Sequence, residues 1–176
     1  TQKCLSAPPG LSPVSFSDMA VNVINNRKTK IQSWFLDVSL VNSYWSGAKR
    51  AYHHTAPVSA MFALREAYRI VLEEGLENRW GRHKQNHESL KIELENMGFE
   101  FLVDKPYRLP MLNAVKIPDG VDDAKVRSVL LSDYNIEIGA GLGQFAGKIW
   151  RVGLMGESST PKHIEMLVSA LKDILK

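Results

Sequence analysis

The sequence predicts a two-part chain of mixed α and β structure, in which a helical, loop-rich part precedes a small α+β domain. From Phe99 onward the expected elements run strand, strand, helix, strand, strand, helix, which is an α+β order rather than a regular βαβ alternation. The first 75 residues are typical of the end of a different unit. We therefore assign residues 1–75 to the first part and 76–176 to the second, with a long helix bridging both.

Turn residues, helix caps and apolar spacing define the elements of the first part. Ser17 or Asp18 can cap a helix, and Pro57 suits the first turn of another. Pro13 restricts its strand to a sheet edge or a strand start. In chain order we expect the end of a strand at 1–4, a turn and short strand at 11–16, a helix to about Asn26, a short buried helix at 34–45, a loop at 47–55 and a helix from Pro57 to Gly75.

A long helix opens the second part, runs over 76–97 and stops at Gly98. Its apolar stripe has nearly pure three- and four-residue spacing, with Leu76, Trp80, His83, His87, Leu90, Leu94 and Met97. The elements expected after it are strands at 99–103 and 111–117, a turn at 118–120, a helix near 126–134, a strand at 135–138, a glycine-rich loop, a strand at 149–154 and a last helix capped by Thr160-Pro161.

Composition excludes several classes of protein. A chain of 176 residues that is 44% hydrophobic and 23% charged suits one or two ordinary domains, and not a disordered, collagenous or disulfide-stapled protein. A net charge of +3 with dispersed basic residues predicts no nucleic-acid partner, and no apolar run reaches the roughly 18–20 residues of a membrane span. One cysteine favours a reducing, cytoplasmic setting. Because the chain opens on Thr1 without Met, we expect a segment of a longer or processed protein.

Lys3 is the first candidate for chemistry. A lysine buried at a strand end loses its charge readily, and its neutral amine can form a Schiff base. A solvated terminal lysine is the plainer interpretation.

The run from Tyr52 to Thr55 is the second candidate. Its hydroxyls, next to a helix start at Pro57, can hold a phosphate. The adjacent His53 and His54 cannot both point the same way on extended backbone. The alternative is a loop with incidental polar residues.

The glycine-rich run 139–148 invites a nucleotide-binding interpretation that fails in detail. The P-loop pattern needs glycine where Leu142 stands and Ser or Thr where Ile149 stands. The run predicts only that backbone passes close to a ligand or to another chain segment.

Arg151 lies inside an otherwise apolar strand and must find a partner, because its charge cannot be shed. Its planar fork suits a carboxylate, although a structural ion pair or an exposed sheet face explains it equally. His83 and His87 have a spacing that can hold a metal, but they lie on the apolar stripe, so we expect hydrogen-bonded buried histidines and no metal site.

These pieces occur in one order that resembles the C-terminal half of the alanine–glyoxylate and serine–pyruvate aminotransferases, class-V members of the fold-type-I pyridoxal-phosphate enzymes. The resemblance covers essentially the whole chain. Its motifs are Thr1-Gln2-Lys3 with Ala7-Pro8-Pro9-Gly10, Arg27-Lys28-Thr29-Lys30, Tyr52-His53-His54-Thr55, Leu64-Arg65-Glu66-Ala67, Glu74-Gly75-Leu76-Glu77-Asn78, Arg108-Leu109-Pro110, Gly141-Leu142-Gly143 and the run Trp150-Arg151-Val152-Gly153-Leu154-Met155-Gly156.

The resemblance implies a role for each candidate. Lys3 matches the Schiff-base lysine that holds pyridoxal 5′-phosphate, and Gln2 matches a residue beside the cofactor phosphate. Tyr52 and Thr55 match phosphate contacts that reach across a homodimer, and Arg151 matches the clamp for the substrate α-carboxylate. It also implies that residues 1–75 end a large α/β domain and that 76–176 form a small domain with a mostly antiparallel sheet.

The expected activity is transfer of an amino group from alanine or serine to glyoxylate or pyruvate. The alternatives are a 3-hydroxykynurenine transaminase, a class-V lyase or desulfurase, and a non-catalytic half that serves as a dimerisation module. A desulfurase needs a mobile-loop cysteine, whereas Cys4 stands beside the lysine. The carboxylate and the aromatic that contact the cofactor ring in the family precede the lysine, so they lie outside this sequence.

Overall fold

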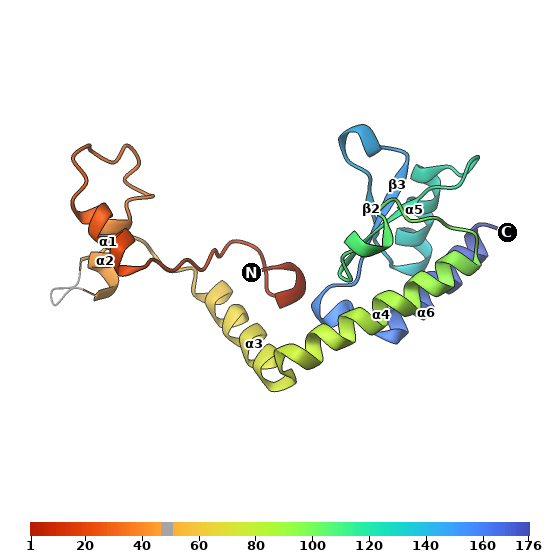
Figure 1. The fold of residues 1–176 in the computed structure, drawn as a ribbon, viewed down its shortest axis with the longest axis horizontal. Coiled ribbons are helices and arrows are strands. Elements are labelled where there is room, and N and C mark those ends of the chain that lie inside the picture. The colour runs from red at the N-terminus through yellow and green to blue at the C-terminus, as the bar shows by residue number, and fades with distance from the viewer. Residues whose placement is uncertain (47–50) are drawn as a thin grey trace. The chain divides into compact units, whose positions relative to one another are not determined.

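The computed structural model describes residues 1–46 and 51–176. The chain divides into two compact units, Thr1 with Pro8–Leu64 and Gln2–Ala7 with Arg65–Lys176. The division thus falls inside a helix rather than near Gly75, and the residues around Lys3 join the second unit. The assignment of residues 1–75 to the end of a large domain stays a prediction. Figure 1 labels the elements of both units.

The first unit holds α1 (Asp18–Asn25), α2 (Val38–Ser46) and the start of α3 (Val58–Glu74). The predicted cap of α1 is confirmed, because the Ser17 hydroxyl accepts a hydrogen bond from the Ala20 amide at 3.3 Å. No strand forms at 11–16, so that prediction is wrong. Pro13 supplies no backbone donor there, and no neighbouring segment of the described chain pairs with it.

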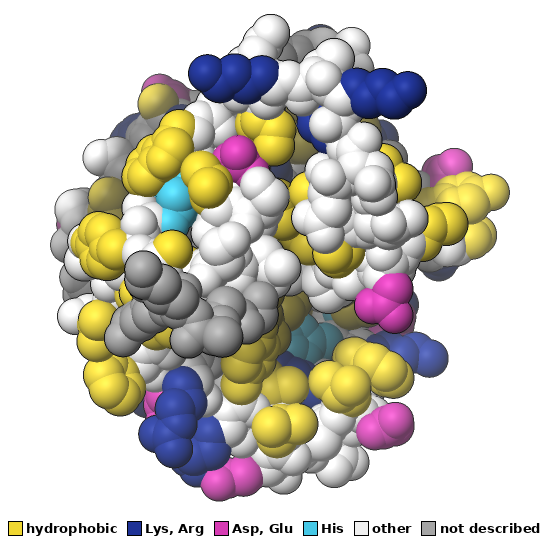
Figure 2. All heavy atoms as spheres, turned by 90° about the vertical axis from the view of Figure 1, so that its left-hand side faces the viewer, with side chains coloured by type: hydrophobic (Ala, Val, Ile, Leu, Met, Phe, Trp, Pro, Cys, Tyr) yellow, Lys and Arg dark blue, Asp and Glu magenta, His cyan; other side chains and the backbone are white. Residues whose placement is uncertain are grey.

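The aromatic segment before α2 is exposed, which contradicts the prediction of a buried helix over 34–45. Helix α2 begins only at Val38, and Trp34 and Phe35 are 60% and 62% exposed. Exposed hydrophobic side chains are coloured yellow in Figure 2. Residues 51–55 form the predicted loop, whereas 47–50 lie outside the described residues.

The second unit packs three helices against a small antiparallel sheet (Figure 1). Helix α6 lies along α4 and also contacts α5. Short 3₁₀ turns η1 to η4 occupy the connections. The elements are η1 (Lys3–Leu5), α4 (Leu76–Asn96), η2 (Lys105–Tyr107), β1 (Leu112–Lys116), α5 (Asp123–Tyr134), β2 (Gly139–Ala140), η3 (Gly143–Phe145), β3 (Ile149–Gly153), η4 (Gly156–Ser158) and α6 (Pro161–Ile174).

The sheet order is β1-β3-β2, with both pairings antiparallel, as predicted. Trp150 lies opposite Val115 in the register, and both are buried on the face that the helices cover. Arg151 lies opposite Ala114 and Gly139, on the other face. The core holds Leu90 and Leu94 of α4, Leu130 of α5, Leu171 of α6, Val115 of β1 and Trp150 of β3.

Three predicted strands of the second unit differ from the structure. Residues 3–5 form a 3₁₀ turn, not the end of a strand. The segment 99–103 makes a single bridge, from Phe101 to Val115, although Leu102 and Lys116 add backbone hydrogen bonds beside it. The strand expected at 135–138 appears later, as β2, because Asn135 takes a left-handed conformation that ends α5 (φ 55°).

The buried stripe of α4 is rotated from the predicted one. Leu76 and Trp80 are exposed, whereas Arg79 and Asn86 are buried beside the two histidines. The observed stripe has the same helical spacing, but its first half is polar and its second half apolar. Polar groups occupy it because each finds a hydrogen-bond partner on the segments that pack against α4.

None of the helices in the described part of the chain is both long and apolar enough to cross a membrane.

The glycine-rich loop is close-packed against its own backbone. A Cβ on Gly141 would lie 2.0 Å from the Phe145 carbonyl oxygen, while the Gly141 amide donates to the Ile149 carbonyl at 3.0 Å. Of the two predicted explanations, the close approach of another chain segment therefore applies at Gly141.

We expect Gly141→Ala to destabilise the full-length protein by about 1–3 kcal/mol, because the added methyl overlaps backbone that cannot rotate away. The control is Gly81→Ala on the exposed side of α4, where nothing lies within 4 Å of the new Cβ. That change should stabilise by about 0.5–1 kcal/mol. Thermal unfolding midpoints measure both, and equal midpoints for the two variants would contradict the assignment.

Candidate active site

Lys3 begins a tight 3₁₀ turn of the second unit, and the residues at the two ends of this turn, Lys3 and Ser6, have a left-handed backbone. The φ of Lys3 is 66° and that of Ser6 is 59°, and the Ser6 amide closes the turn on the Lys3 carbonyl at 2.9 Å. Residues other than glycine adopt this backbone conformation only when their surroundings enforce it. The Lys3 side chain is exposed, and its amine has no hydrogen bond or ion pair with the described residues. The turn thus fixes the backbone and leaves the amine available.

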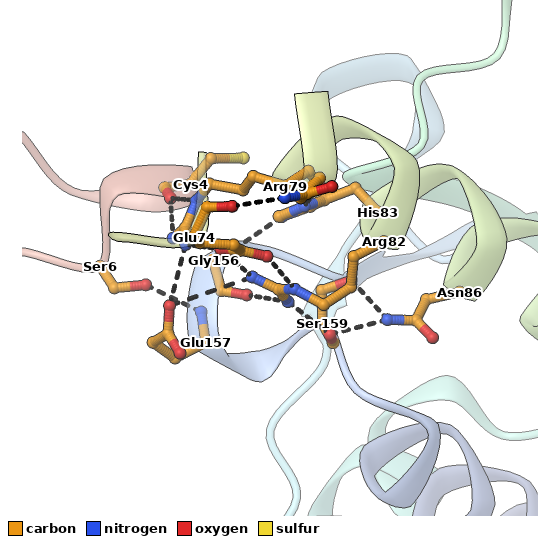
Figure 3. A network of polar contacts seen from close by, with 11 residues as sticks. Cys4, Ser6, Glu74, Arg79, Arg82, His83, Asn86, Gly156, Glu157 and Ser159 are labelled. Atoms are coloured by element: carbon orange, nitrogen blue, oxygen red, sulfur yellow. Dashed lines mark hydrogen bonds and ion pairs between the residues drawn. The ribbon is translucent and has the colours of Figure 1, made fainter. Parts of the chain in front are cut away.

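Three contacts enforce the turn (Figure 3). Arg79 donates two hydrogen bonds to the Cys4 carbonyl, from Nε at 3.3 Å and from a terminal nitrogen at 2.7 Å. The Glu157 amide donates to the Ser6 hydroxyl at 3.0 Å. Gly156 packs so closely that a Cβ on it would lie 1.9 Å from the Ser6 Oγ.

Acidic side chains compensate the buried charge of Arg79. Its guanidinium pairs with Glu74 at 2.5 Å and with Glu157 at 3.0 Å. Arg82 shares Glu74 at 2.6 Å and also donates to the Gly156 carbonyl at 2.9 Å. The network therefore ties the end of α3, the first turns of α4, η4 and the lysine turn together (Figure 3).

Glu74 is the charge that the network shares. The hydrogen bond from Arg82, followed by that from Arg79, lowers the pKa of its carboxyl from 4.5 to about 2, against the opposing effect of burial. Glu74 is thus ionised throughout the neutral range, as two adjacent guanidinium groups require.

The two buried histidines are hydrogen-bonded, as expected from the sequence. The Gly156 amide donates to His83 Nε2 at 2.9 Å, so His83 carries its hydrogen on Nδ1 and donates it to the Arg79 carbonyl at 2.7 Å. His87 Nδ1 donates to the Asn113 side-chain oxygen at 2.7 Å. His83 therefore belongs to the scaffold behind the lysine turn.

Arg151 stands on the face of the sheet opposite the core. Its Nε donates to the Ala140 carbonyl at 2.7 Å, and its guanidinium lies against Gly139, which has no side chain to displace it. No carboxylate of residues 1–46 or 51–176 forms an ion pair with it. This excludes a structural ion pair within the described chain and leaves the two terminal nitrogens free for an anionic ligand.

Tyr52 and Thr55 belong to the first unit, where their hydroxyls are hydrogen-bonded to each other. Both side chains are exposed. The rings of His53 and His54 both contact Trp34, with centroids 4.2 Å and 5.6 Å from it, so the two side chains meet at one residue rather than diverging as expected for an extended backbone. Residues 51–57 form no strand.

The second unit thus contains Gln2, Lys3 and Arg151, and the first contains Tyr52 and Thr55. Gln2 is exposed beside the lysine. The sequence analysis missed the anchors of the turn, Arg79 and Gly156. Their signal was present in the spacing, because Arg79 and Asn86 extend the stripe of His83 and Leu90 at helical intervals. Polar residues in such a stripe indicate buried partners rather than an apolar face.

The depressed pKa of Glu74 predicts a loss of stability in acid. The unfolded carboxyl binds its proton near pH 4.5 and the folded one near pH 2, so its contribution is complete above pH 4.5 and declines as the pH falls toward 2. The effect is on the order of 2 kcal/mol. In the full-length protein, the difference in unfolding free energy between wild type and Glu74→Gln should therefore shrink between pH 6 and pH 3.

The control is Glu73→Gln, whose carboxyl pairs only with the exposed Arg69 among the described residues. We expect a small effect at both pH values. A Glu74→Gln difference that stays constant with pH would contradict the shift.

Comparison with known proteins assigns the family. Residues 1–152 match the family model of the class-V aminotransferases. The chain is 41% identical over its full length to the alanine–glyoxylate aminotransferase of Callithrix jacchus, covering 43% of that protein. It is 36% identical over 99% of its length to the (S)-ureidoglycine–glyoxylate transaminase of Bacillus subtilis strain 168, covering 46% of it.

A solved structure gives the same result. The alanine–glyoxylate aminotransferase of Nostoc sp. superposes with a TM-score of 0.92 at 48% identity, over 99% of this chain and 46% of that one. The chain spans less than half the length of these relatives. The likeness confirms the α/β fold of type I that the sequence predicted. On these matches, the chain belongs to the class-V aminotransferases, a family that uses pyridoxal 5′-phosphate.

Proposed function

We propose that the complete protein is an aminotransferase that moves an amino group from a small amino acid, alanine or serine, to glyoxylate or pyruvate. One observation carries the proposal: the second unit contains both Lys3, on a turn held by its neighbours, and Arg151. Neither side chain forms an ion pair with the described residues. Relatives named for alanine–glyoxylate transfer support the substrate class.

The described residues fit pyridoxal phosphate. Lys3 offers an exposed amine, and Tyr52 and Thr55 offer two adjacent exposed hydroxyls of the kind that bind a phosphate. We propose that Lys3 holds the cofactor through its amine, that Gln2 contacts its phosphate, and that Tyr52 and Thr55 contact the phosphate of the cofactor bound by the other subunit of a homodimer. The bound cofactor supplies an electron sink for the bonds at the substrate Cα.

Lys3 then has a second task. In the cofactor-loaded protein, the Lys3 amine displaced by the incoming amino acid would serve as a base: Nζ would take up the proton from the substrate Cα and would give the same proton back in the reverse half of the reaction. The turn restrains the Lys3 backbone, so the motion is confined to the side chain.

Arg151 binds the substrate α-carboxylate in this proposal. Two parallel N–H donors match two carboxylate oxygens, and such charge-assisted pairs orient as well as attract. The hydrogen bond from Nε to the Ala140 carbonyl fixes the plane of the fork, and Gly139, which has no side chain, lets the guanidinium lie against the sheet. Donor and acceptor acids share this carboxylate, so one arginine serves both halves of the reaction.

The alternatives find less support. Cys4 serves the turn through its carbonyl, and its thiol is the only one in the sequence, which disfavours a desulfurase. A non-catalytic half would not need a lysine and an arginine that both lack an ion pair with the residues that the structure describes. The relatives at 36–41% identity are named for transfer to glyoxylate, which disfavours a 3-hydroxykynurenine transaminase.

We also propose that the complete protein is a cytoplasmic homodimer in which Tyr52 and Thr55 reach the partner's cofactor. Their exposure and mutual hydrogen bond support the dimer contact, and the single cysteine supports a reducing compartment.

The decisive variant is Lys3→Ala. In the full-length, cofactor-loaded protein, borohydride treatment followed by peptide mass spectrometry should find the mass of the cofactor on Lys3. The Lys3→Ala variant should lack this label, and its transamination rate should be lower by a factor of at least about 10²–10⁴. Lys84→Ala, on the exposed side of α4, is the control and should change neither. A wild-type protein with no label on Lys3 would refute the aminotransferase proposal.

Arg151→Lys tests the carboxylate clamp. The ammonium keeps the charge but loses the fork, so KM should rise for both the amino acid and the oxo acid by the equivalent of about 2–4 kcal/mol. Arg69→Lys, an exposed arginine with carboxylate partners on α3, should leave both KM values unchanged. Wild-type KM values in Arg151→Lys would return this arginine to a structural role.

A further inference from the structure

The lysine turn is held by backbone and side-chain contacts that converge on one small patch. Arg79 is 5% exposed. It donates two hydrogen bonds to the carbonyl of Cys4, the residue directly after Lys3. The contact joins segments far apart in the sequence, and it lies inside the short turn whose two ends, Lys3 and Ser6, have a left-handed backbone. A guanidinium is costly to bury, so its placement here calls for a purpose beyond packing.

The geometry of Arg79 explains how it acts on the turn. Nε and a terminal nitrogen share one acceptor, the Cys4 carbonyl, which fixes the direction of that peptide plane. Glu74 and Glu157 bind the other terminal nitrogen and fix the guanidinium in turn. The peptide between Cys4 and Leu5, inside the turn that begins at Lys3, is therefore fixed by a side chain that is itself held in place (Figure 3).

We propose that Arg79 is a positioning residue for Lys3: by fixing the Cys4 carbonyl it keeps the Lys3 backbone left-handed and so aims the amine. This rests on the proposed role of Lys3. Without Arg79 the turn relaxes toward an ordinary right-handed or extended backbone, which Lys3 prefers. The Cα–Cβ bond of Lys3 then points elsewhere, and the amine must search for its position.

The experiment uses full-length protein with Arg79→Met, which keeps much of the side-chain volume and removes every donor. Hydrogen exchange of the apoprotein should quicken by about tenfold or more in the peptide that spans residues 2–6, because the Ser6 amide closes the turn. In the loaded protein, kcat should fall by about 10- to 100-fold, with KM values for alanine and glyoxylate changed far less. Arg79→Lys, which keeps the charge beside Glu74 but not the paired donors, should fall between.

Arg127→Met is the matched control, because it removes a partly buried arginine and its ion pair with Asp123 without touching the turn. It should leave exchange at residues 2–6 and the ratio of kcat to KM as in wild type. Equal effects of Arg79→Met and Arg127→Met on both measurements overturn the proposal, since Arg79 would then act only through general stability.

Ser6→Ala keeps the test open if Arg79→Met does not fold. It removes an exposed hydroxyl that accepts from the Glu157 amide, and it should quicken exchange in residues 2–6 and lower kcat in the same direction but less. Wild-type exchange and kcat in Ser6→Ala count against the proposal. The two proposals fail separately: an unlabelled wild-type Lys3 after borohydride overturns its cofactor role, whereas normal exchange and kcat in the variants overturn the positioning role alone.

Discussion

The pairing of β3 with both of its neighbours is the constraint on which the second unit depends. Because side chains alternate along a strand, the same pairing buries Trp150 in the core and sets Arg151 on the opposite face. The indole of Trp150 donates to Asp123 at the start of α5 at 2.9 Å, which ties the strand to a helix. A register slip of one residue would exchange the two side chains, so that Trp150 would leave the core and Arg151 would enter it.

The segment directly after β3 connects the sheet to the turn that begins at Lys3. Gly156 follows the strand after a short connection. Its amide donates a hydrogen bond to His83, and its Cα lies against the side chain of Ser6. The strand β3 and the residues directly after it therefore position both Arg151 and the glycine that packs against the lysine turn. Helix α4 supplies the other wall through Arg79. Two functional side chains are thus held by one rigid scaffold rather than by separate loops.

Local sequence patterns predicted the secondary structure correctly where interactions within one segment determine it. The caps at Ser17 and Thr160 and the apolar spacing of α6 predicted helices that form. Patterns failed where a partner decides: the segment 11–16 has strand composition but no neighbouring strand in the described chain. The site followed the same division. Lys3 and Arg151 were candidates from their residue type and place in the chain, and the family resemblance gave each an expected role. The turn that begins at Lys3 and its arginine anchor depend on contacts between segments that no single stretch of sequence encodes.

Arg79 binds the chain at position 4 through a carbonyl oxygen, which every amino acid provides. The anchoring is therefore indifferent to the side chain of Cys4, while at position 156 even one methyl group meets the Ser6 hydroxyl. Positions 4 and 156 thus differ in the substitutions that they tolerate. Position 4 accepts any side chain without loss of the turn, whereas position 156 requires glycine.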